Sequence, residues 1–362
     1  MRVLHVIARM NVGGTARYIT NLLQDLESHG TEVLLATGHV ESSEIETLEL
    51  NNLNYTRIPS LSRSINPFQD LQAYFQLKKL INAYKPDIVH SHTFKAGFIS
   101  RIKVGNYKIV HTFHGHLFED PTFTGIKTTI ITLIEKMLAK KSHKLVVVGN
   151  QVEYDLLKRG VGAKDKYLNI PPGINPLKIP NRIDALNELG ISNPSEFIVG
   201  WLARVTDVKN PYLLVEIAKM LPDTTFLMGG GGDLIEKIKE ISPPNLIVLG
   251  WVKPESLIGA SDLILSTSKN EGVPISLIES QMAGKPVVAT NVGGVSDIIK
   301  HQTTGILCSS SALSIKNSIN ALISDPKVLE LLSIAAAESS IEAFSISRMT
   351  HLHLRLYKEL TH

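Results

Sequence analysis

Short apolar runs alternate with amphipathic stretches along almost the whole chain. In the first half, the runs that predict strands are Val3–Ala8, Glu32–Thr37, Tyr55–Ile58, Asp87–Ser91, Lys108–Phe113, Leu145–Val148 and Tyr167–Ile170. After an interruption they resume as Phe197–Leu202, Thr225–Met228, Leu246–Leu249, Asp262–Ser266 and Pro286–Thr290. Runs this short and this apolar are typical of strands that a parallel sheet buries on both faces.

The stretches between these runs have the period of helices. Thr15–His29 and Pro67–Tyr84 are the clearest of them. The first puts four apolar residues on one face, namely Ile19, Leu22, Leu23 and Leu26. The strand–helix alternation predicts an α/β fold, with a mainly parallel sheet covered by helices on both faces. In such sheets ligands bind outside the carboxyl ends of the strands, so we look for chemistry in the strand-to-helix loops.

Prolines are dense between residues 171 and 180, which excludes the interior of a helix or strand there. The alternation restarts beyond them, so the sequence predicts two Rossmann-like domains that face each other across a cleft. The predicted boundaries are residues 1–172 for the N-terminal domain and 173–345 for the C-terminal domain. Residues 346–362 are expected to form a C-terminal helix that packs back on the N-terminal domain.

Composition and charge narrow the function classes. The chain has 362 residues, of which 43% are hydrophobic and 20% charged, as in an ordinary globular protein with a substantial core. Its net charge of +3 does not demand nucleic acid as a partner. The single cysteine, Cys308, excludes an internal disulfide and a cysteine-based metal site. No segment resembles a signal peptide or a membrane span of roughly 20 apolar residues, so we expect a cytoplasmic location.

The segment Lys269–Glu279 carries the strongest functional signal. It follows the predicted strand Asp262–Ser266. Because proline suits the first helical turn, a helix is predicted to begin near Pro274. Glu271 then lies in the loop at the positive end of this helix, and Glu279 lies in its second turn.

This arrangement could hold a phosphorylated sugar. Backbone N–H groups at Gly272 and Val273 would suit a phosphate, and the carboxylates of Glu271 and Glu279 could accept hydrogen bonds from hydroxyls of a sugar and a ribose. The alternative is structural: Glu271 would be only an acid at a helix start, and Glu279 a solvated helix residue. The spacing of the two glutamates alone favours neither interpretation.

A pair of cations follows another predicted strand. Arg204 and Lys209 precede Pro211, where a second helix is predicted to begin. Cations near a helix start are slightly unfavourable, by about 0.3–1 kcal/mol each. A bound diphosphate would reverse that sign through charge-assisted contacts. The alternative is that both are solvated surface charges.

The first strand-to-helix loop, Asn11–Thr15, contains Gly13 and Gly14. Paired glycines allow the backbone to approach a ligand closely at a helix start. The G-x-G-x-x-G pattern of dinucleotide-binding folds is absent from this loop. A simple tight turn remains the alternative.

Histidines end two strands of the first domain. His90 and His92 end one, and His114 and His116 follow another. A histidine at the edge of a cleft can donate to a hydroxyl or a phosphate. For His90, His92 and His116 we favour a hydrogen-bonding role in the core or a loop, whereas for His114 the ligand-binding role is equally well supported. No acidic partner lies at a spacing diagnostic of a metal site, so no metal is expected.

Two further segments carry weaker signals. Gly229–Gly232 follows a strand and would form a mobile loop near a nucleotide, or a simple flexible turn. Ile126–Lys144 mixes apolar residues with five lysines. It could contact an anionic membrane, but a helix packed on its sheet with a basic solvent face is favoured.

Together, these motifs in this order resemble the family-4 retaining glycosyltransferases of the GT-B fold. The resemblance covers essentially the whole chain. Its most specific part is the run Asn270–Gly294, whereas the matches over Gly200–Pro211 and at Gly13 and Gly14 are of moderate specificity.

The resemblance implies a role for each matching position. Arg204 and Lys209 would hold the diphosphate of a nucleotide-sugar donor. Glu271 and His114 would contact the transferred sugar, and Glu279 would contact the ribose. The implied catalytic residues are Glu271, His114, Arg204 and Lys209. The implied donor-binding residues are Gly13, Gly14, Arg204, Lys209, Gly250, Trp251, Val252, Glu271, Gly272, Val273, Pro274 and Glu279, of which positions 250–252 would hold the base.

The resemblance further implies a hexosyltransferase that uses a nucleotide-diphosphate sugar, with UDP the commonest nucleotide in the family. The C-terminal domain would bind this donor, and the N-terminal domain would bind a glycan or lipid-linked acceptor. Attack on the same face would retain the anomeric configuration, while domain closure would exclude water. Neither a metal nor another cofactor is expected. Peripheral contact with the inner face of the membrane and the oligomeric state stay open.

Two rival functions fit the same fold. A nucleotide-aminosugar epimerase would change the sugar without needing an acceptor. A non-catalytic relative would bind a nucleotide or glycan without turnover. The joint presence of Arg204, Lys209, Glu271 and Glu279 counts against the non-catalytic relative.

Overall fold

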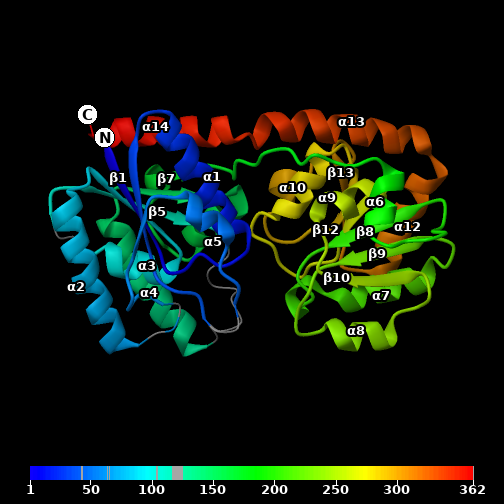
Figure 1. Cartoon of the computed structure of the whole chain (residues 1–362), viewed down its shortest axis with the longest axis horizontal. Helices are drawn as coiled ribbons and strands as arrows, with labels where there is room; N and C mark the ends of the chain where they lie inside the picture. Colours follow the sequence, from blue (N-terminus) through cyan, green and yellow to red (C-terminus); the bar gives the residue numbers. More distant parts are fainter. Residues whose placement is uncertain (42–43, 63, 65, 103–104, 116–124, 362) are drawn as a thin grey trace. The chain divides into compact units, whose positions relative to one another are not determined.

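The computed structural model describes residues 1–41, 44–62, 64, 66–102, 105–115 and 125–361, which form two compact units. Unit 1 comprises Met1–Ile174 and Ser345–His362, and unit 2 comprises Asn175–Phe344. Figure 1 shows the elements of both units along the sequence. Each unit has its own parallel sheet with helices on both faces, so the predicted α/β class with two Rossmann-like domains is confirmed.

Unit 1 is built on a seven-stranded sheet in the order β3-β2-β1-β4-β5-β6-β7, in which every pairing is parallel. Its strands are β1 (Arg2–Ile7), β2 (Glu32–Thr37), β3 (Tyr55–Arg57), β4 (Ile88–His92), β5 (Lys108–Phe113), β6 (Lys144–Val147) and β7 (Tyr167–Asn169). Its α-helices are α1 (Gly14–Ser28), α2 (Pro67–Tyr84), α3 (Phe94–Ser100), α4 (Ile126–Lys141), α5 (Asn150–Lys158) and α14 (Ile346–Thr361).

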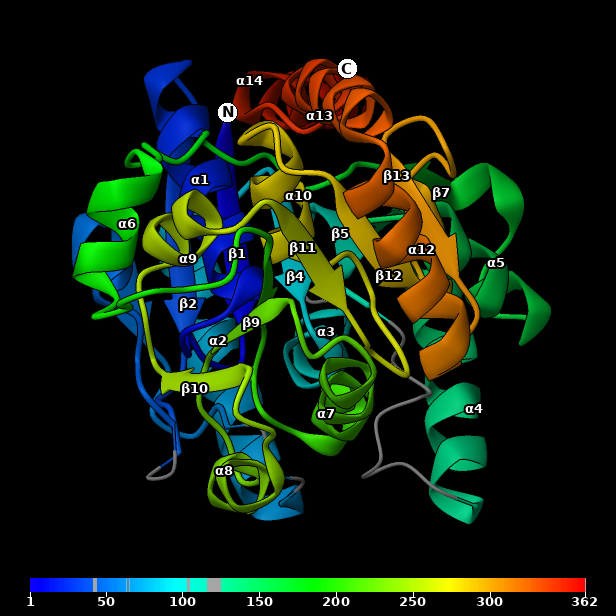
Figure 2. The ribbon, with the colours of Figure 1, turned by 90° about the vertical axis from the view of Figure 1, so that its right-hand side faces the viewer.

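The two faces of this sheet have different partners. Leu4 and Val6 of β1 pack in one apolar core with residues of α2 and α3. His5, which lies between them, points to the opposite face, where its ring contacts Tyr357 of α14. Figures 1 and 2 show α2 and α3 on one side of the sheet and α1 and α14 on the other. Alternation along a strand therefore gives β1 one apolar face and one face with a polar core residue.

Local sequence explains where the helices begin. The side chain of Asn66 accepts hydrogen bonds from the backbone N–H groups of Phe68 and Gln69, and Pro67 takes the first helical position of α2. The four apolar residues predicted on one face of α1 are all buried. These two predicted helices are confirmed to within one residue at their ends.

The C-terminal helix packs on unit 1, as predicted. Tyr18 of α1 lies within hydrogen-bonding distance of His353 of α14, with 3.3 Å between Oη and Nε2. The backbone N–H of Gly173 contacts Met349 Sδ, and a Cβ at Gly173 would lie only 2.6 Å from the Cα of Ile346. Residues 173 and 174 therefore belong with unit 1.

Unit 2 has a six-stranded parallel sheet in the order β10-β9-β8-β11-β12-β13. Its strands are β8 (Ile198–Leu202), β9 (Thr225–Gly229), β10 (Leu246–Gly250), β11 (Leu263–Ser266), β12 (Val287–Thr290) and β13 (Gly305–Cys308). Its α-helices are α6 (Arg182–Glu188), α7 (Pro211–Met220), α8 (Ile235–Ile241), α9 (Pro254–Ala260), α10 (Ile275–Met282), α11 (Val295–Ile298), α12 (Ala312–Ser324) and α13 (Pro326–Ala343). The core on one face combines the sheet with α7, α8 and α12.

The strand β13 was not predicted. It is a four-residue edge strand that begins with Gly305, and its two central residues are only partly buried. A run this short has too little apolar pattern to distinguish it from a loop.

An ion pair is buried in unit 1 between α3 and α4. Arg101 Nη2 donates to Glu135 Oε1 at 2.7 Å, and both side chains are 0% exposed. Arg101 Nε also donates to the carbonyl oxygen of Gly97 at 2.9 Å. Within the described part of the chain, Arg101 Nη1 and Glu135 Oε2 have no partner. The ion pair is thus isolated from water, and its two charges meet through the single hydrogen bond between Arg101 Nη2 and Glu135 Oε1.

Glu135→Ala should destabilise unit 1 by about 3–5 kcal/mol, because it leaves the Arg101 guanidinium buried without its anion. Amide hydrogen exchange over β5 and α4 measures this loss as a rise in exchange rates. The matched control is Glu359→Ala in the exposed Arg355–Glu359 pair of α14, which should cost less than about 1 kcal/mol. Equal losses of stability in the two variants would show that the buried Arg101–Glu135 pair contributes no more than an exposed pair.

Candidate active site

The strand order of unit 2 reverses between β8 and β11, the position at which open parallel sheets bind ligands. The loop after β8 carries Arg204 and Lys209 and leads into α7 at Pro211. The loop after β11 carries Glu271 and leads into α10 at Ile275. Both helices begin within one residue of the predicted prolines.

Lys209 and Glu271, 62 residues apart in the chain, form an ion pair between these loops. Lys209 Nζ donates to both carboxylate oxygens of Glu271, at 2.6 Å to Oε1 and 2.7 Å to Oε2. Ser268 Oγ donates to Oε1 at 2.7 Å. Glu271 is 8% exposed and Lys209 is 21% exposed, so the alternative of a solvated surface charge is wrong for Lys209.

The buried hydroxyl of Thr267 connects the loop after β11 to the loop that carries Lys209. Thr267 Oγ1 lies 3.0 Å from the carbonyl oxygens of both Lys209 and Asn210, and it accepts a hydrogen bond from Trp201 Nε1 at 2.9 Å. Asn210 adopts the left-handed conformation, with φ of 51°, which turns the chain directly into α7. Lys209 is thereby fixed at its backbone as well as at its ammonium group.

The start of α10 presents free donors. The backbone N–H groups of Gly272 and Val273 donate to no acceptor in the described part of the chain. Glu279 lies in the second turn of α10, as predicted, and is 3% exposed. The alternative of a solvated helix residue is therefore wrong for Glu279.

Sequence reasoning did not assign a role to Gly293 and Gly294, which follow β12. The backbone N–H of Gly294 donates to the carbonyl oxygen of Glu271 at 2.9 Å. A Cβ at Gly294 would lie 1.9 Å from the carbonyl oxygen of Gly272, and one at Gly293 would lie 2.1 Å from that of Glu271. The glycine pair therefore lets two loops touch and positions Glu271. The signal was present in the sequence as a double glycine that begins three residues after a predicted strand.

The four-glycine segment after β9 also has a packing role. A Cβ at Gly230 would lie 1.9 Å from the carbonyl oxygen of Ala203, and one at Gly232 would lie 2.4 Å from that of Val205. Val205 donates its backbone N–H to Gly231 at 2.9 Å. We predicted a mobile loop or a simple flexible turn here. The glycines are instead required by close backbone contact with the loop that carries Arg204.

The remaining donor-binding candidates of unit 2 lie at its surface. Arg204 is exposed, and no ion pair joins it to another described residue. Trp251 is 71% exposed, and a Cβ at Gly231 would lie 2.3 Å from its Nε1. Gly250, which ends β10, has a positive φ of 73°. These side chains are available to a ligand rather than committed to the core.

Candidates of unit 1 gather around α1. Gly13 and Gly14 precede and begin this helix, and both are exposed. Tyr18, one turn further on, places its ring edge-on to His114, with 4.8 Å between ring centroids. His114, directly after β5, is partly exposed.

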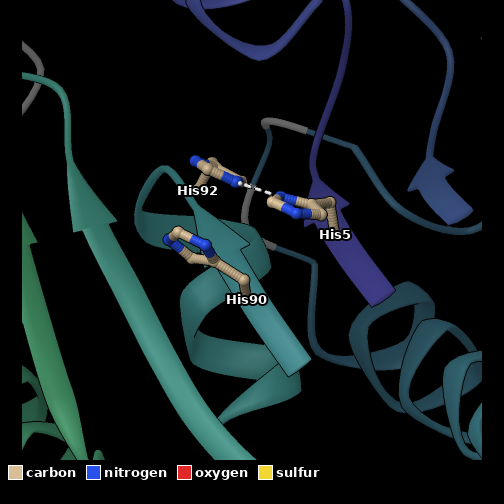
Figure 3. A group of neighbouring side chains, drawn as sticks. All are labelled: His5, His90 and His92. Atoms are coloured by element: carbon tan, nitrogen blue, oxygen red, sulfur yellow. Dashed lines mark hydrogen bonds between the residues drawn. The ribbon is translucent and has the colours of Figure 1, made fainter. Parts of the chain in front are cut away.

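Three further histidines of unit 1, on β1 and β4, are buried and hydrogen-bonded. His5, His90 and His92 are each 0% exposed, and Figure 3 shows their rings gathered where β1 and β4 lie side by side. The preferred interpretation of His90 and His92 as hydrogen-bonded core residues is confirmed. His116 lies outside the described residues.

The three imidazoles are close enough to hold a metal, with ligand atoms within 4.8 Å of one another. Their nitrogens are already occupied, however. His90 bonds to Tyr357 and Thr112, and His92 bonds to His5 and His114. Of these ring nitrogens, only Nε2 of His5 has no partner among the described residues. A metal would have to break these hydrogen bonds, so the trio fits a hydrogen-bond network better.

The helix α4 buries one face, as favoured, but its solvent face differs from the predicted one. Leu138 is buried, but Ile130, Leu133 and Met137 are exposed by 51%, 55% and 59%. Its solvent face is therefore apolar as well as basic. No helix in the described ranges is long and apolar enough to cross a membrane.

Known proteins resemble this chain over most of its length. A galactosyltransferase of Escherichia coli, UDP-Gal:alpha-D-GlcNAc-diphosphoundecaprenol alpha-1,3-galactosyltransferase, is 29% identical over 325 residues, which cover 84% of this chain and 83% of that protein. The capsular polysaccharide biosynthesis glycosyltransferase CapM of Staphylococcus aureus is 23% identical, with coverage of 81% and 82%.

Solved structures share the fold. Sucrose-phosphate synthase of Thermosynechococcus elongatus matches with a TM-score of 0.84 at 20% identity and 99% coverage of both chains. HepE of Anabaena, in complex with UDP-glucose, matches with a TM-score of 0.82 at 16% identity, over 99% of this chain and 100% of that one. At these identities the likeness concerns the fold alone.

Two family descriptions match separate parts of the chain. Glycosyltransferase Family 4 matches residues 12–177, and Glycosyl transferases group 1 matches residues 187–339. With the two parallel α/β units, these matches define a glycosyltransferase of the GT-B fold. The chain belongs to glycosyltransferase family 4 and is a hexosyltransferase.

Lys209→Met and Glu271→Gln should each destabilise unit 2, because each leaves a partly buried partner without its counterpart. The double variant should lose less than the sum of the two, with a coupling of about 1–2 kcal/mol. Urea unfolding followed by tryptophan fluorescence measures this, because Trp201 and Trp251 both lie in unit 2.

The matched control is the Lys269–Asp207 pair, which joins the same two loops but is exposed by 50% and 72%. Its double-mutant cycle should give a coupling below about 1 kcal/mol. A coupling as large as that of the Lys209 pair would contradict the importance of burial.

Proposed function

We propose that this enzyme transfers a hexose from a UDP-sugar to a hydroxyl of a glycan or lipid-linked acceptor. Transfer retains the anomeric configuration and needs no metal ion. The geometry of Lys209 and Glu271 carries the proposal, with support from the free donors at Gly272 and Val273.

The unused hydrogen-bonding capacity of the ion pair matches a sugar diphosphate. A lysine ammonium has three donors, and Lys209 gives two of them to Glu271. One N–H is left for a phosphate oxygen. A carboxylate has about four lone-pair sites, and Glu271 uses three on Lys209 and Ser268. One site is left for a sugar hydroxyl.

The diphosphate has further partners close by in the sequence. Gly272 and Val273 offer backbone N–H groups at the positive end of α10, and Arg204 is an exposed cation on the neighbouring loop. Glu279 in α10 is the acceptor for ribose hydroxyls. Trp251 and its neighbours hold the base. Gly14 and His114 of unit 1 stay predictions as donor-binding residues.

Charge development explains why these residues matter for rate. When the bond between the anomeric carbon and the phosphate oxygen breaks, positive charge grows on the sugar and negative charge on the diphosphate. Arg204, Lys209 and the start of α10 stabilise the diphosphate. The acceptor hydroxyl attacks on the same face, and its proton passes to the leaving phosphate. No protein carboxylate is needed as a nucleophile.

The acceptor is proposed to be lipid-linked. The E. coli relative named above acts on a diphosphoundecaprenol-linked sugar. The exposed apolar residues Ile130, Leu133 and Met137 of α4 lie beside exposed lysines, a combination that suits the surface of an anionic membrane. A peripheral position at the inner face of the membrane follows, and the cytoplasmic location stays a prediction.

Neither rival function gains support. An epimerase would release UDP or alter the donor without an acceptor, and a binding protein would do neither. Following both UDP release and the identity of the donor's sugar, with and without a lipid-linked N-acetylglucosamine diphosphate, separates all three. We expect release that depends on the acceptor.

Arg204→Ala and Glu271→Ala should each lower the transfer rate by at least about a hundredfold, because each removes stabilisation that grows in the transition state. UDP release with a panel of UDP-hexoses and a lipid-linked acceptor measures the rate, and NMR of the product reports its anomeric configuration. Tryptophan fluorescence shows whether unit 2 keeps its fold.

The control is Lys239→Ala, which changes an exposed residue of α8 that forms an ion pair with the exposed Glu236 of the same helix. It should transfer at the wild-type rate. Wild-type rates in either Arg204→Ala or Glu271→Ala would refute the proposed site, and an inverted product would refute the retaining mechanism.

Removal of divalent metals with EDTA should leave the transfer rate unchanged. Arg204, Lys209 and the α10 start already supply the positive charge that Mg²⁺ gives to diphosphates in metal-dependent enzymes. The measurement is the same UDP-release assay before and after chelation. A loss that Mg²⁺ or Mn²⁺ restores would overturn metal independence.

A further inference from the structure

Three imidazoles of unit 1 form a continuous hydrogen-bonded chain from the core to the surface. His5 Nδ1 lies 3.0 Å from His92 Nε2, and His92 Nδ1 lies 2.9 Å from His114 Nε2. His5 and His92 are 0% exposed, whereas His114 is partly exposed. Figure 3 shows the inner link, between the rings of His5 and His92.

The sheet register produces this chain. β1 and β4 are neighbours, with His5 opposite His90 and Ile7 opposite His92. His114 follows β5, the next strand, so the three rings step across adjacent strands towards their carboxyl ends. The strand order of unit 1 reverses between β1 and β4, so the chain of rings lies where such sheets bind ligands.

Each ring in the chain is neutral. Burial lowers the pKa of His5 to about 3, with a further contribution from the charge of His353, and it lowers the pKa of His114 to about 3 for the same reasons. Burial also holds the pKa of His92 well below its usual value. A neutral imidazole has one N–H and one acceptor nitrogen, so a hydrogen-bonded chain of such rings can run in only two directions.

The inner end of the chain distinguishes the two directions. His5 Nε2 is buried and has no partner among the described residues. If the chain ran inwards, this nitrogen would carry a buried N–H without an acceptor. If the chain runs outwards, the nitrogen keeps only a lone pair. Orphaned buried N–H groups are the rarer of the two in native proteins, because a desolvated proton without an acceptor is costly.

We propose that the unpartnered nitrogen of His5 sets the direction of the chain, so that His5 donates to His92, His92 donates to His114, and His114 presents Nδ1–H as a hydrogen-bond donor. His5 and His92 are therefore positioning residues for His114. The inference rests on the proposed function for its ligand: the donor N–H of His114 is directed at an acceptor oxygen of the nucleotide sugar.

Neighbouring groups restrict His114 further. His353 Nδ1 lies 2.9 Å from the carbonyl oxygen of Met349, which can only accept, so His353 carries its proton on Nδ1 and its Nε2 accepts from Tyr18. Tyr18 is thus held in place, with its ring edge-on to His114 at an interplanar angle of 83°. Accepting a hydrogen bond at Nε2 also polarises His114 and makes its Nδ1–H a stronger donor.

The direct test is the tautomer of His114 in the free protein. Long-range ¹H–¹⁵N correlation spectra of protein labelled with ¹⁵N-histidine distinguish a proton on Nδ1 from one on Nε2. His114→Gln identifies the signals by their loss. We expect His114 in the Nδ1–H form, and the Nε2–H form would overturn the proposal.

Matched substitutions at His92 test the relay itself. His92→Asn places an amide at the position of Nδ1 and can still donate to His114, whereas His92→Gln places its amide at the position of Nε2 and cannot. We expect the tautomer of His114 to persist in the first variant and to become mixed in the second. The same tautomer in both variants would show that His92 does not set it.

His90→Asn is the control. His90 is equally buried and packs on His92, but its nitrogens bond to Tyr357 and Thr112 rather than to the relay. It should leave the tautomer of His114 unchanged. If it changed the tautomer as strongly as His92→Gln, general disturbance of the core would replace the relay as the explanation.

Kinetics then separate the relay from the proposed function. His114→Asn, which retains a donor at the Nδ1 position, should keep a kcat/KM about tenfold higher than His114→Gln, equivalent to about 1.4 kcal/mol. An Nδ1–H tautomer with no such difference would leave the relay standing and refute the contact with the sugar nucleotide. Addition of Zn²⁺ should leave the histidine spectra of the free protein unchanged. Zn²⁺-induced shifts of His5, His90 and His92 together would overturn the relay in favour of a metal site.

Discussion

Strands that are buried on both faces have little room for solvated polar side chains, and this constraint determines where each unit holds its chemistry. In unit 2 the strands are almost wholly apolar, so the charged residues of the candidate site lie beyond their carboxyl ends. Arg204, Lys209 and Glu271 all occupy loops there. The reversal of strand order between β8 and β11 brings two of these loops together, and the Lys209–Glu271 ion pair fixes their separation.

Unit 1 meets the same constraint differently, because polar residues lie within its strands. His5, His90 and His92 point to the face covered by α1 and α14, where no water reaches them. Buried polar groups must find partners. These rings find them in one another and in Tyr357 of α14, so the C-terminal helix completes the core of the N-terminal unit. β1 therefore contributes Leu4 and Val6 to the apolar core and His5 to the orientation of His114.

The sequence allowed prediction of what depends on local pattern. Proline positions predicted the starts of α7 and α10, and apolar periodicity predicted α1 and twelve of the strands. Relations between distant segments could not be predicted. The contact of Lys209 with Glu271 spans 62 residues, and the histidine chain depends on the register of β1 with β4. The glycines of Gly229–Gly232 suggested mobility because nothing local reveals the backbone that packs against them.

The hydrogen-bond geometry also explains how one ion pair would serve the proposed donor, which carries both hydroxyls and phosphates. Lys209 neutralises Glu271 while retaining one donor, and Glu271 retains one acceptor site. Ser268 hydrogen-bonds the carboxylate of Glu271, and Thr267 hydrogen-bonds the backbone of Lys209. In the proposed reaction, neither residue would have to move into place when charge develops. Groups that are already oriented stabilise developing charge with little reorganisation during the reaction. This preorganisation is the main source of electrostatic catalysis. In the proposed site, a lysine without the glutamate would still attract a diphosphate but would lack a fixed direction towards the sugar.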